Sequence, residues 1–157
     1  MKHIILALVE NRPGVLARMA GLFSARGFNI DSLTVGETED PTISRMTIVV
    51  RGDDRTLEQV KKQLNKLIDT ISVKDFVKKE FIDRELMLFK VNVDDKTKDK
   101  VKNIIEKSKD KIVKISKDYI IVEAVGDENH IKTLLSNLEK YGITHVTRTG
   151  RIAMAVE

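Results

Sequence analysis

The chain has 157 residues and a net charge of +4, with 41% hydrophobic and 33% charged residues. This composition favours a packed globular fold, and the absence of cysteine excludes disulfides and thiolate chemistry. The apolar run at residues 4–9 is too short to span a membrane and lacks a signal-peptide cleavage site, so we expect a cytoplasmic protein without a membrane partner.

The first half of the chain predicts the element order β-α-β-β-α-β. An apolar strand is followed by apolar residues at helical spacing, which end at Gly27, a common helix stop. Pro41 favours a turn between two later strands, and Asp53 can cap a second helix. The expected strands lie at 4–9, 28–36, 43–51 and within 71–81, and the expected helices carry Val15 to Phe23 and Leu57 to Ile68.

The same order repeats from Arg84 onward, although the residues themselves do not repeat. A Gly-Asp pair precedes the second helix of each half, as Gly52-Asp53 and Gly126-Asp127. The expected strands lie at 86–93, 112–116, 119–125 and 143–149, and the expected helices carry Val101 to Ile105 and Ile131 to Leu138.

This repeated order predicts an α+β protein with two ferredoxin-like βαββαβ domains, which we place at residues 1–78 and 79–157. Each domain would form an antiparallel sheet with helices on one face. Such a sheet leaves strand edges open, and pairing the edges of two subunits removes that exposure. We therefore expect a dimer as the minimum assembly.

Charge and motif patterns argue against several kinds of function. Lysines alternate with acidic residues and aromatic residues are few, which disfavours nucleic-acid binding. The histidines, His3, His130 and His145, lack the spacing of a metal site and a carboxylate partner pattern, and no glycine pattern matches a phosphate or dinucleotide loop. The acidic pairs at 53–54 and 94–95 precede helices and are expected to cap them. We therefore expect no catalytic residue, no metal site and no cofactor in this chain.

The loop after the first strand carries the main functional signal. Asn11, Pro13 and Gly14 join that strand to a helix whose free backbone N–H groups attract a carboxylate. Gly14 has no Cβ, so a ligand oxygen can approach the backbone, and the amide oxygen of Asn11 can accept from an ammonium group. The same residues also occur in turns that only begin a helix, and the loop alone leaves both interpretations open.

Three segments of the first half form a specific pattern: Val9-Glu-Asn-Arg-Pro-Gly-Val-Leu16, Arg26-Gly-Phe-Asn-Ile-Asp-Ser-Leu33 and Ser44-Arg-Met-Thr-Ile-Val-Val50. They resemble the ACT domain of the acetolactate (acetohydroxyacid) synthase small-subunit family. Arg84-Glu-Leu-Met-Leu-Phe-Lys-Val91 and Arg148-Thr-Gly-Arg-Ile-Ala-Met154 resemble that family's second domain. The resemblance covers nearly the whole chain, and the segment 76–83 departs from the family's linker.

The resemblance implies a regulatory subunit that performs no catalysis itself. It would act in branched-chain amino acid biosynthesis, binding the catalytic (large) subunit of acetolactate synthase and raising its activity. It would also mediate allosteric feedback inhibition by valine or a related aliphatic amino acid. Thiamine diphosphate, Mg and FAD are expected on the catalytic partner only. The alternative is a stand-alone amino-acid-sensing ACT regulator, such as a transcriptional one, although no DNA-reading helix is recognisable.

Matching to the family also implies a homodimer joined through the ACT domain, with an effector site shared by its two subunits. The site would comprise Asn11, Gly14, Val15 and Leu16 of one subunit with Asn29 and Ile30 of its dimer mate. Without the resemblance, Asn29 is an ordinary residue after a helix and Ile30 an ordinary core residue. The corresponding loop of the second half, 93–97, has two acids and neither proline nor glycine. Because those acids would repel a carboxylate, we expect no amino-acid site there.

Overall fold

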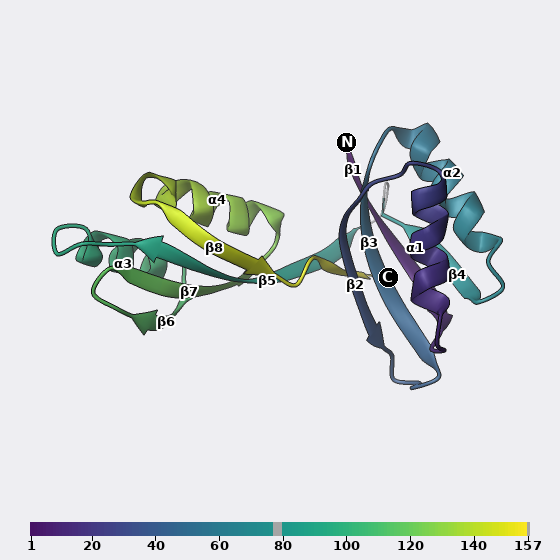
Figure 1. Cartoon of the computed structure of the whole chain (residues 1–157), viewed down its shortest axis with the longest axis horizontal. Coiled ribbons are helices and arrows are strands. Elements are labelled where there is room, and N and C mark those ends of the chain that lie inside the picture. The colour runs from purple at the N-terminus through teal and green to yellow at the C-terminus, as the bar shows by residue number, and fades with distance from the viewer. Residues whose placement is uncertain (77–79, 157) are drawn as a thin grey trace. The chain divides into compact units, whose positions relative to one another are not determined.

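The computed structural model describes residues 1–76 and 80–156 (Figure 1). The chain forms two compact units, of which unit 1 comprises residues 1–82 with 151–157 and unit 2 comprises residues 83–150. The expected boundary between residues 78 and 79 lies outside the described residues. None of the described helices is long and apolar enough to cross a membrane.

Unit 1 contains one antiparallel sheet with two helices packed on one of its faces (Figure 1). Its strands lie in the order β2-β3-β1-β4, so β2 and β4 form the edges. The elements are β1 (Lys2–Glu10), α1 (Val15–Ala25), β2 (Ile30–Glu37), β3 (Ile43–Arg51), α2 (Asp54–Asn65) and β4 (Thr70–Asp75).

The core of unit 1 lies between the sheet and the helices because every second residue of a strand points to the same face, and these residues are apolar on the helix side of the central strands. Ile5, Ala7 and Val9 of β1 are fully buried on the helix side. Met19 and Phe23 of α1 pack against them at helical spacing. The cluster is completed by further residues of the two helices and β3: Val15, Leu22, Met46, Ile48, Val50, Leu57, Val60 and Leu64.

The opposite face of this sheet carries a second, smaller cluster formed with the end of the chain. Strand β9 (Ile152–Ala155) pairs with β5 (Phe81–Asn92) and buries Ala153 against Ile4, Val49 and Phe76. We expected the second domain to run to residue 157, but residues 151–157 group with unit 1. The physical reason is this apolar contact, since Ala153 is 7% exposed.

Unit 2 repeats the topology of unit 1. Its strands lie in the order β6-β7-β5-β8, with β5 in the place that β1 takes in the first sheet. The further elements are α3 (Lys98–Lys107), β6 (Lys111–Ile115), β7 (Tyr119–Gly126), α4 (Glu128–Leu138), a 3₁₀ turn (Glu139–Tyr141) and β8 (Ile143–Arg148). Alternate residues of β5, namely Met87, Phe89 and Val91, pack against α3 and α4. The predicted pair of ferredoxin-like units is confirmed.

The repeated Gly-Asp pairs have the same structural role in both units. Asp53 accepts a hydrogen bond from the Thr56 backbone N–H at 2.8 Å, and Asp127 accepts one from the His130 N–H at 2.8 Å. The glycine before each Asp is required because a side chain of the first helical turn, Thr56 or His130, lies directly against it. A Cβ at residue 52 would lie 2.6 Å from the Thr56 Cβ, and one at residue 126 would collide with the His130 ring.

The acidic pair at 94–95 differs from the expectation of a helix cap. Asp94 accepts from the backbone N–H groups of Lys96 and Thr97 at 2.9 and 2.8 Å, which closes a turn ahead of α3. Thr97 occupies the N-cap position of that helix. The carboxylate is therefore used within its own loop.

Candidate effector site

The loop between β1 and α1 places Gly14 at the N-cap of α1. Its φ of 83° is left-handed, a conformation that glycine adopts without steric cost. No side chain caps the helix there, so the first-turn N–H groups face outward as expected for a helix terminus. The Val15 N–H makes a long contact of 3.4 Å with the Arg12 carbonyl, which leaves the N–H groups of Gly14 and Leu16 as the better donors.

Side chains of the predicted site residues lie in different environments. Val15 is buried in the helix-side core at 3% exposure, so only its backbone can contact a ligand. Leu16 is 45% exposed on α1 and presents an aliphatic side chain beside the loop. The helix start therefore offers backbone donors next to one apolar side chain.

Asn11 ties the loop to the turn between β2 and β3. Its backbone N–H donates to the Thr42 carbonyl at 2.8 Å, and its side-chain Nδ2 donates to the Pro41 carbonyl at 2.9 Å. One of the two side-chain N–H groups is thereby engaged, and the amide oxygen can accept from a ligand ammonium group.

Arg18 lies beside the predicted site, and the sequence argument did not name it. Its Nε donates to Asp69 Oδ2 at 2.8 Å, while its Nη1 lies 2.9 Å from the position of a Cβ on Gly14. The hydrogen bond to Asp69 raises the pKa of Arg18, so the guanidinium stays charged. Its spacing of four residues from Gly14 was the available signal, because such residues share one helix face.

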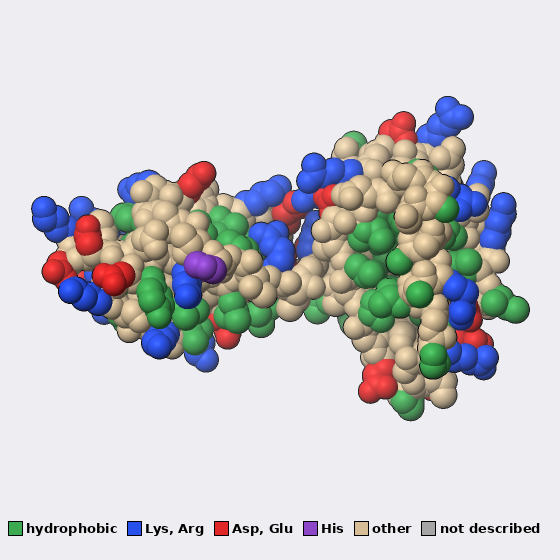
Figure 2. Space-filling view, viewed as in Figure 1, with side chains coloured by type: hydrophobic (Ala, Val, Ile, Leu, Met, Phe, Trp, Pro, Cys, Tyr) green, Lys and Arg blue, Asp and Glu red, His purple; other side chains and the backbone are tan. Residues whose placement is uncertain are grey.

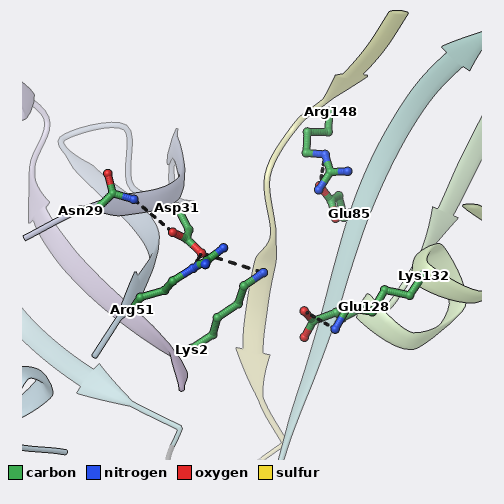
Figure 3. A network of polar contacts seen from close by, with 8 residues as sticks. All are labelled: Lys2, Asn29, Asp31, Arg51, Glu85, Glu128, Lys132 and Arg148. Atoms are coloured by element: carbon green, nitrogen blue, oxygen red, sulfur yellow. Dashed lines mark hydrogen bonds and ion pairs between the residues drawn. The ribbon is translucent and has the colours of Figure 1, made fainter. Parts of the chain in front are cut away.

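Asn29 lies in a polar network at the start of β2 (Figure 3). Its Nδ2 donates to Asp31 Oδ1 at 3.2 Å, and Asp31 Oδ2 accepts from Arg51 Nε at 2.7 Å. The hydrogen bond from Arg51 lowers the pKa of Asp31, with the nearby Lys2 adding to the effect. Figure 3 shows the amide oxygen of Asn29 directed away from Asp31, where it can accept from another group.

Within one chain, the two halves of the predicted site lie at opposite ends of the sheet. Ile30 pairs with Val50, which pairs with His3 near the start of β1. The Asn11–Gly14 loop follows Glu10 at the other end of β1. The strand rises seven times by one residue from His3 to Glu10, which corresponds to about 23 Å. A single copy therefore does not bring Asn29 and Ile30 to the loop.

The histidines also depart from the expectation in one respect, because His130 has a carboxylate partner. Its Nε2 lies 2.9 Å from Asp110 Oδ2, and Ser108 Oγ donates to the same carboxylate oxygen at 2.6 Å. The serine hydroxyl is directed to the carboxylate and not to the imidazole, so the three residues do not form an activated nucleophile. Among residues 1–76 and 80–156 there is no group of three or more potential metal ligands.

Comparisons with known proteins extend over both units. A family model described as "AHAS small subunit-like ACT domain" matches residues 5–72, and one described as "Small subunit of acetolactate synthase" matches residues 84–157. The probable acetolactate synthase small subunit of Archaeoglobus fulgidus is 49% identical over 154 residues, which cover 98% of this chain and 96% of that protein. The acetolactate synthase small subunit of Bacillus subtilis is 43% identical, with coverage of 99% and 91%.

A solved structure agrees with these matches. The crystal structure of the acetolactate synthase small subunit from Thermotoga maritima superposes with a TM-score of 0.87 at 36% identity, covering 100% of this chain and 98% of that chain. Both the fold and the resemblance expected from the sequence are confirmed. The chain belongs to the family of acetolactate synthase small subunits, with an ACT domain in its first half.

Proposed function

We propose that this protein is the regulatory subunit of acetolactate synthase in branched-chain amino acid biosynthesis. It binds the catalytic subunit, raises its activity and makes it sensitive to feedback inhibition by valine or a related aliphatic amino acid. Thiamine diphosphate, Mg and FAD belong to the catalytic partner in this proposal. The observation that carries it is a helix start suited to hold an amino acid beside Asn11, in a chain of this family.

The loop accounts for both charged ends of such an effector. The carboxylate accepts from the N–H groups of Gly14 and Leu16, and the Arg18 guanidinium adds positive charge at the same helix end. The ammonium group donates to the Asn11 amide oxygen. No acid, base or nucleophile is part of this arrangement, so the ligand is bound and not converted.

A second copy supplies the rest of the site. Two β2 edges that pair antiparallel place the start of one β2 beside the end of the other. Glu37, at the end of β2, pairs with Ser44, which pairs with Val9 next to the loop. Asn29 and Ile30 of the partner subunit then reach the Asn11–Gly14 loop. Figure 2 shows hydrophobic side chains at the surface of unit 1 beside β2, which supports this edge as an interface.

The energies involved are sufficient for regulation. Burial of a valine side chain against Ile30 and Leu16 contributes about 1.5–3 kcal/mol, and the charged ends add affinity and orientation. Allosteric coupling of about 1–3 kcal/mol arises if the effector binds one arrangement of the dimer better than another.

The test compares Gly14→Asp with Gly14→Asn. The two side chains have the same shape and both tolerate a left-handed backbone, so they differ mainly in charge. Calorimetry should show that valine binding falls in both variants and falls further in Gly14→Asp. In reconstituted enzyme, inhibition should weaken while activation persists.

Two outcomes would contradict the proposal. Undiminished inhibition in Gly14→Asp would exclude this loop as the effector site. Valine binding by a chain that neither binds nor activates a catalytic subunit would favour the stand-alone regulator instead.

A further inference from the structure

The face of the unit 1 sheet opposite the helices is only partly covered. Ala153 of β9 packs on one row of side chains across the strands, formed by Val49, Ile4 and Phe76. The next two rows are Thr47, Leu6 and Lys74, followed by Arg45, Leu8 and Ser72. Residues of these rows line a groove together with β9, and the lining comprises Leu6, Leu8, Arg45, Ser72, Lys74, Met154 and Ala155.

This groove has an apolar floor and a cationic rim. It encloses about 160 Å³ between Leu6 and Leu8 of β1, with Met154 and Ala155 of β9 along one side. Arg45 and Lys74 stand on either side of the floor. Neither of these two side chains makes an ion pair in the part of the chain that the structure describes.

The outer side of β9 extends the apolar surface of the groove. Ile152, Met154 and Val156 alternate with alanines and are 53%, 61% and 55% exposed. Alternate residues of an extended segment lie on one side, so these three form a stripe. Met154 belongs to both the stripe and the groove wall, which makes the two surfaces continuous. An exposed apolar patch with a charged rim is typical of a protein interface.

From these features we infer that the groove and the β9 stripe are the docking surface for the catalytic subunit. The inference rests on the proposed function and names the surface through which it operates. The part of the partner that docks is an extended segment with apolar side chains at alternate positions and at least one carboxylate. Its apolar side chains fill the floor, and its carboxylate pairs with Arg45 and Lys74.

The charge of the rim distinguishes this occupant from a second copy of the same chain. Two copies placed face to face would bring the same Arg45 and Lys74 side chains together, and like charges across an interface oppose association. The effector loop follows Glu10 at the end of β1, and none of its residues lines this groove.

The experiment measures binding of the full chain to an acetolactate synthase catalytic subunit by biolayer interferometry at low ionic strength. The test variants are Arg45→Glu/Lys74→Glu, which reverses the rim charge, and Met154→Asp, which interrupts the apolar wall. The matched control is Arg55→Glu/Lys62→Glu, an equal charge change on exposed residues of α2 on the other side of the sheet. Thermal unfolding and valine calorimetry are recorded for every variant.

We expect both test variants to raise the Kd for the catalytic subunit at least about tenfold, and the control to change it by less than about twofold. Valine binding should stay at the wild-type level in all of them. Wild-type affinity for the partner in both test variants would overturn the docking surface while leaving the proposed function intact.

Two further results would also overturn the docking surface. If the wild-type chain does not bind the catalytic subunit, the proposed function and the docking surface both fail. If Arg45→Glu/Lys74→Glu loses valine binding but keeps its affinity for the partner, the groove is a small-molecule site and the docking inference is wrong.

Discussion

At the scale of single residues, Arg18 links the stability of unit 1 to its ligand chemistry. The guanidinium holds the buried Asp69 carboxylate through Nε, which fixes Nη1 next to Gly14. Arg18→Met should weaken valine binding about three- to tenfold, because a positive charge is lost where the carboxylate is held. Arg18→Lys should lose less valine affinity, since lysine keeps the positive charge although it lacks the guanidinium geometry.

Calorimetric titration of each Arg18 variant with valine checks this expectation. Arg26→Met is the matched control, because Arg26 lies at the other end of α1 and bonds Gln63 at 2.8 Å. Equal losses of valine affinity in Arg18→Met and Arg26→Met would show that Arg18 contributes only to the general stability of the helix.

Asp53 makes the stability of unit 1 fall at acid pH. Its hydrogen bonds from the backbone N–H and hydroxyl of Thr56 lower its pKa in the folded state. The stabilisation is therefore complete above the unfolded value of about 3.9 and is lost as the pH falls through the lower folded value. Asp53→Asn keeps a capping side chain that does not titrate.

Denaturant unfolding of the wild type and Asp53→Asn from pH 7 to pH 2 measures this effect. The two proteins should have similar stability at pH 7, and the wild type should lose more stability below pH 4. If the free energy of unfolding changed with pH in the same way for both proteins, the Asp53 carboxylate would not contribute to the acid sensitivity.

At the scale of elements, α1 contains a glycine that its packing does not require. Gly21 is exposed in the helix interior, and a Cβ there would have no neighbouring atom within 4 Å. Gly21→Ala should raise the free energy of unfolding by about 1 kcal/mol, because alanine loses less conformational entropy in a helix. Chemical denaturation measures the change.

Gly52→Ala provides the contrast, since the added Cβ would meet the Thr56 side chain at 2.6 Å. This variant should be destabilised by about 1–3 kcal/mol, the usual range for overpacking. A neutral Gly52→Ala would indicate that the start of α2 can shift without cost.

Local patterns predicted most elements, because their signals lie within a few residues. The apolar run at residues 4–9 predicted β1, and the Gly-Asp pairs predicted the starts of α2 and α4. The sequence did not predict β9, because its four residues are too few to give a clear strand signal and are held against Ile4 at the other end of the chain. The contact of His130 with Asp110 was missed for the same reason, since it joins residues of different elements.

The candidate site was predictable only in part. The loop with Asn11 and Gly14 has a local signature, and the structure places it at the end of β1 as expected. The bond from Asn11 to Pro41 depends on the packing of the β2–β3 turn, which no local pattern reports. The contribution of Asn29 and Ile30 depends on a second subunit and stays a prediction.

At the scale of the whole molecule, the last residues of the chain should stabilise unit 1 and not unit 2. Ala153→Asp would bury an unpaired carboxylate against Ile4 and Phe76, which should cost about 2–4 kcal/mol. Native-state hydrogen exchange should show lower protection in β1 and unchanged protection in β7. Met154→Asp, at an exposed position of the same strand, should change neither.

The proposed effector site is incomplete in one subunit, so a change that weakens the dimer should also weaken valine binding. Val35 is 41% exposed on the edge strand β2, so Val35→Lys would place like charges on both sides of a β2–β2 interface. Sedimentation velocity should show a dimer Kd raised at least about tenfold, and calorimetry at the same concentrations should show a parallel loss of valine binding. Val146→Lys, on the edge strand β8 at 46% exposure, is the matched control and should alter neither property. A monomeric Val35→Lys that binds valine with wild-type affinity would show that one subunit holds the entire site, since the ligand would then need no residue from a dimer mate.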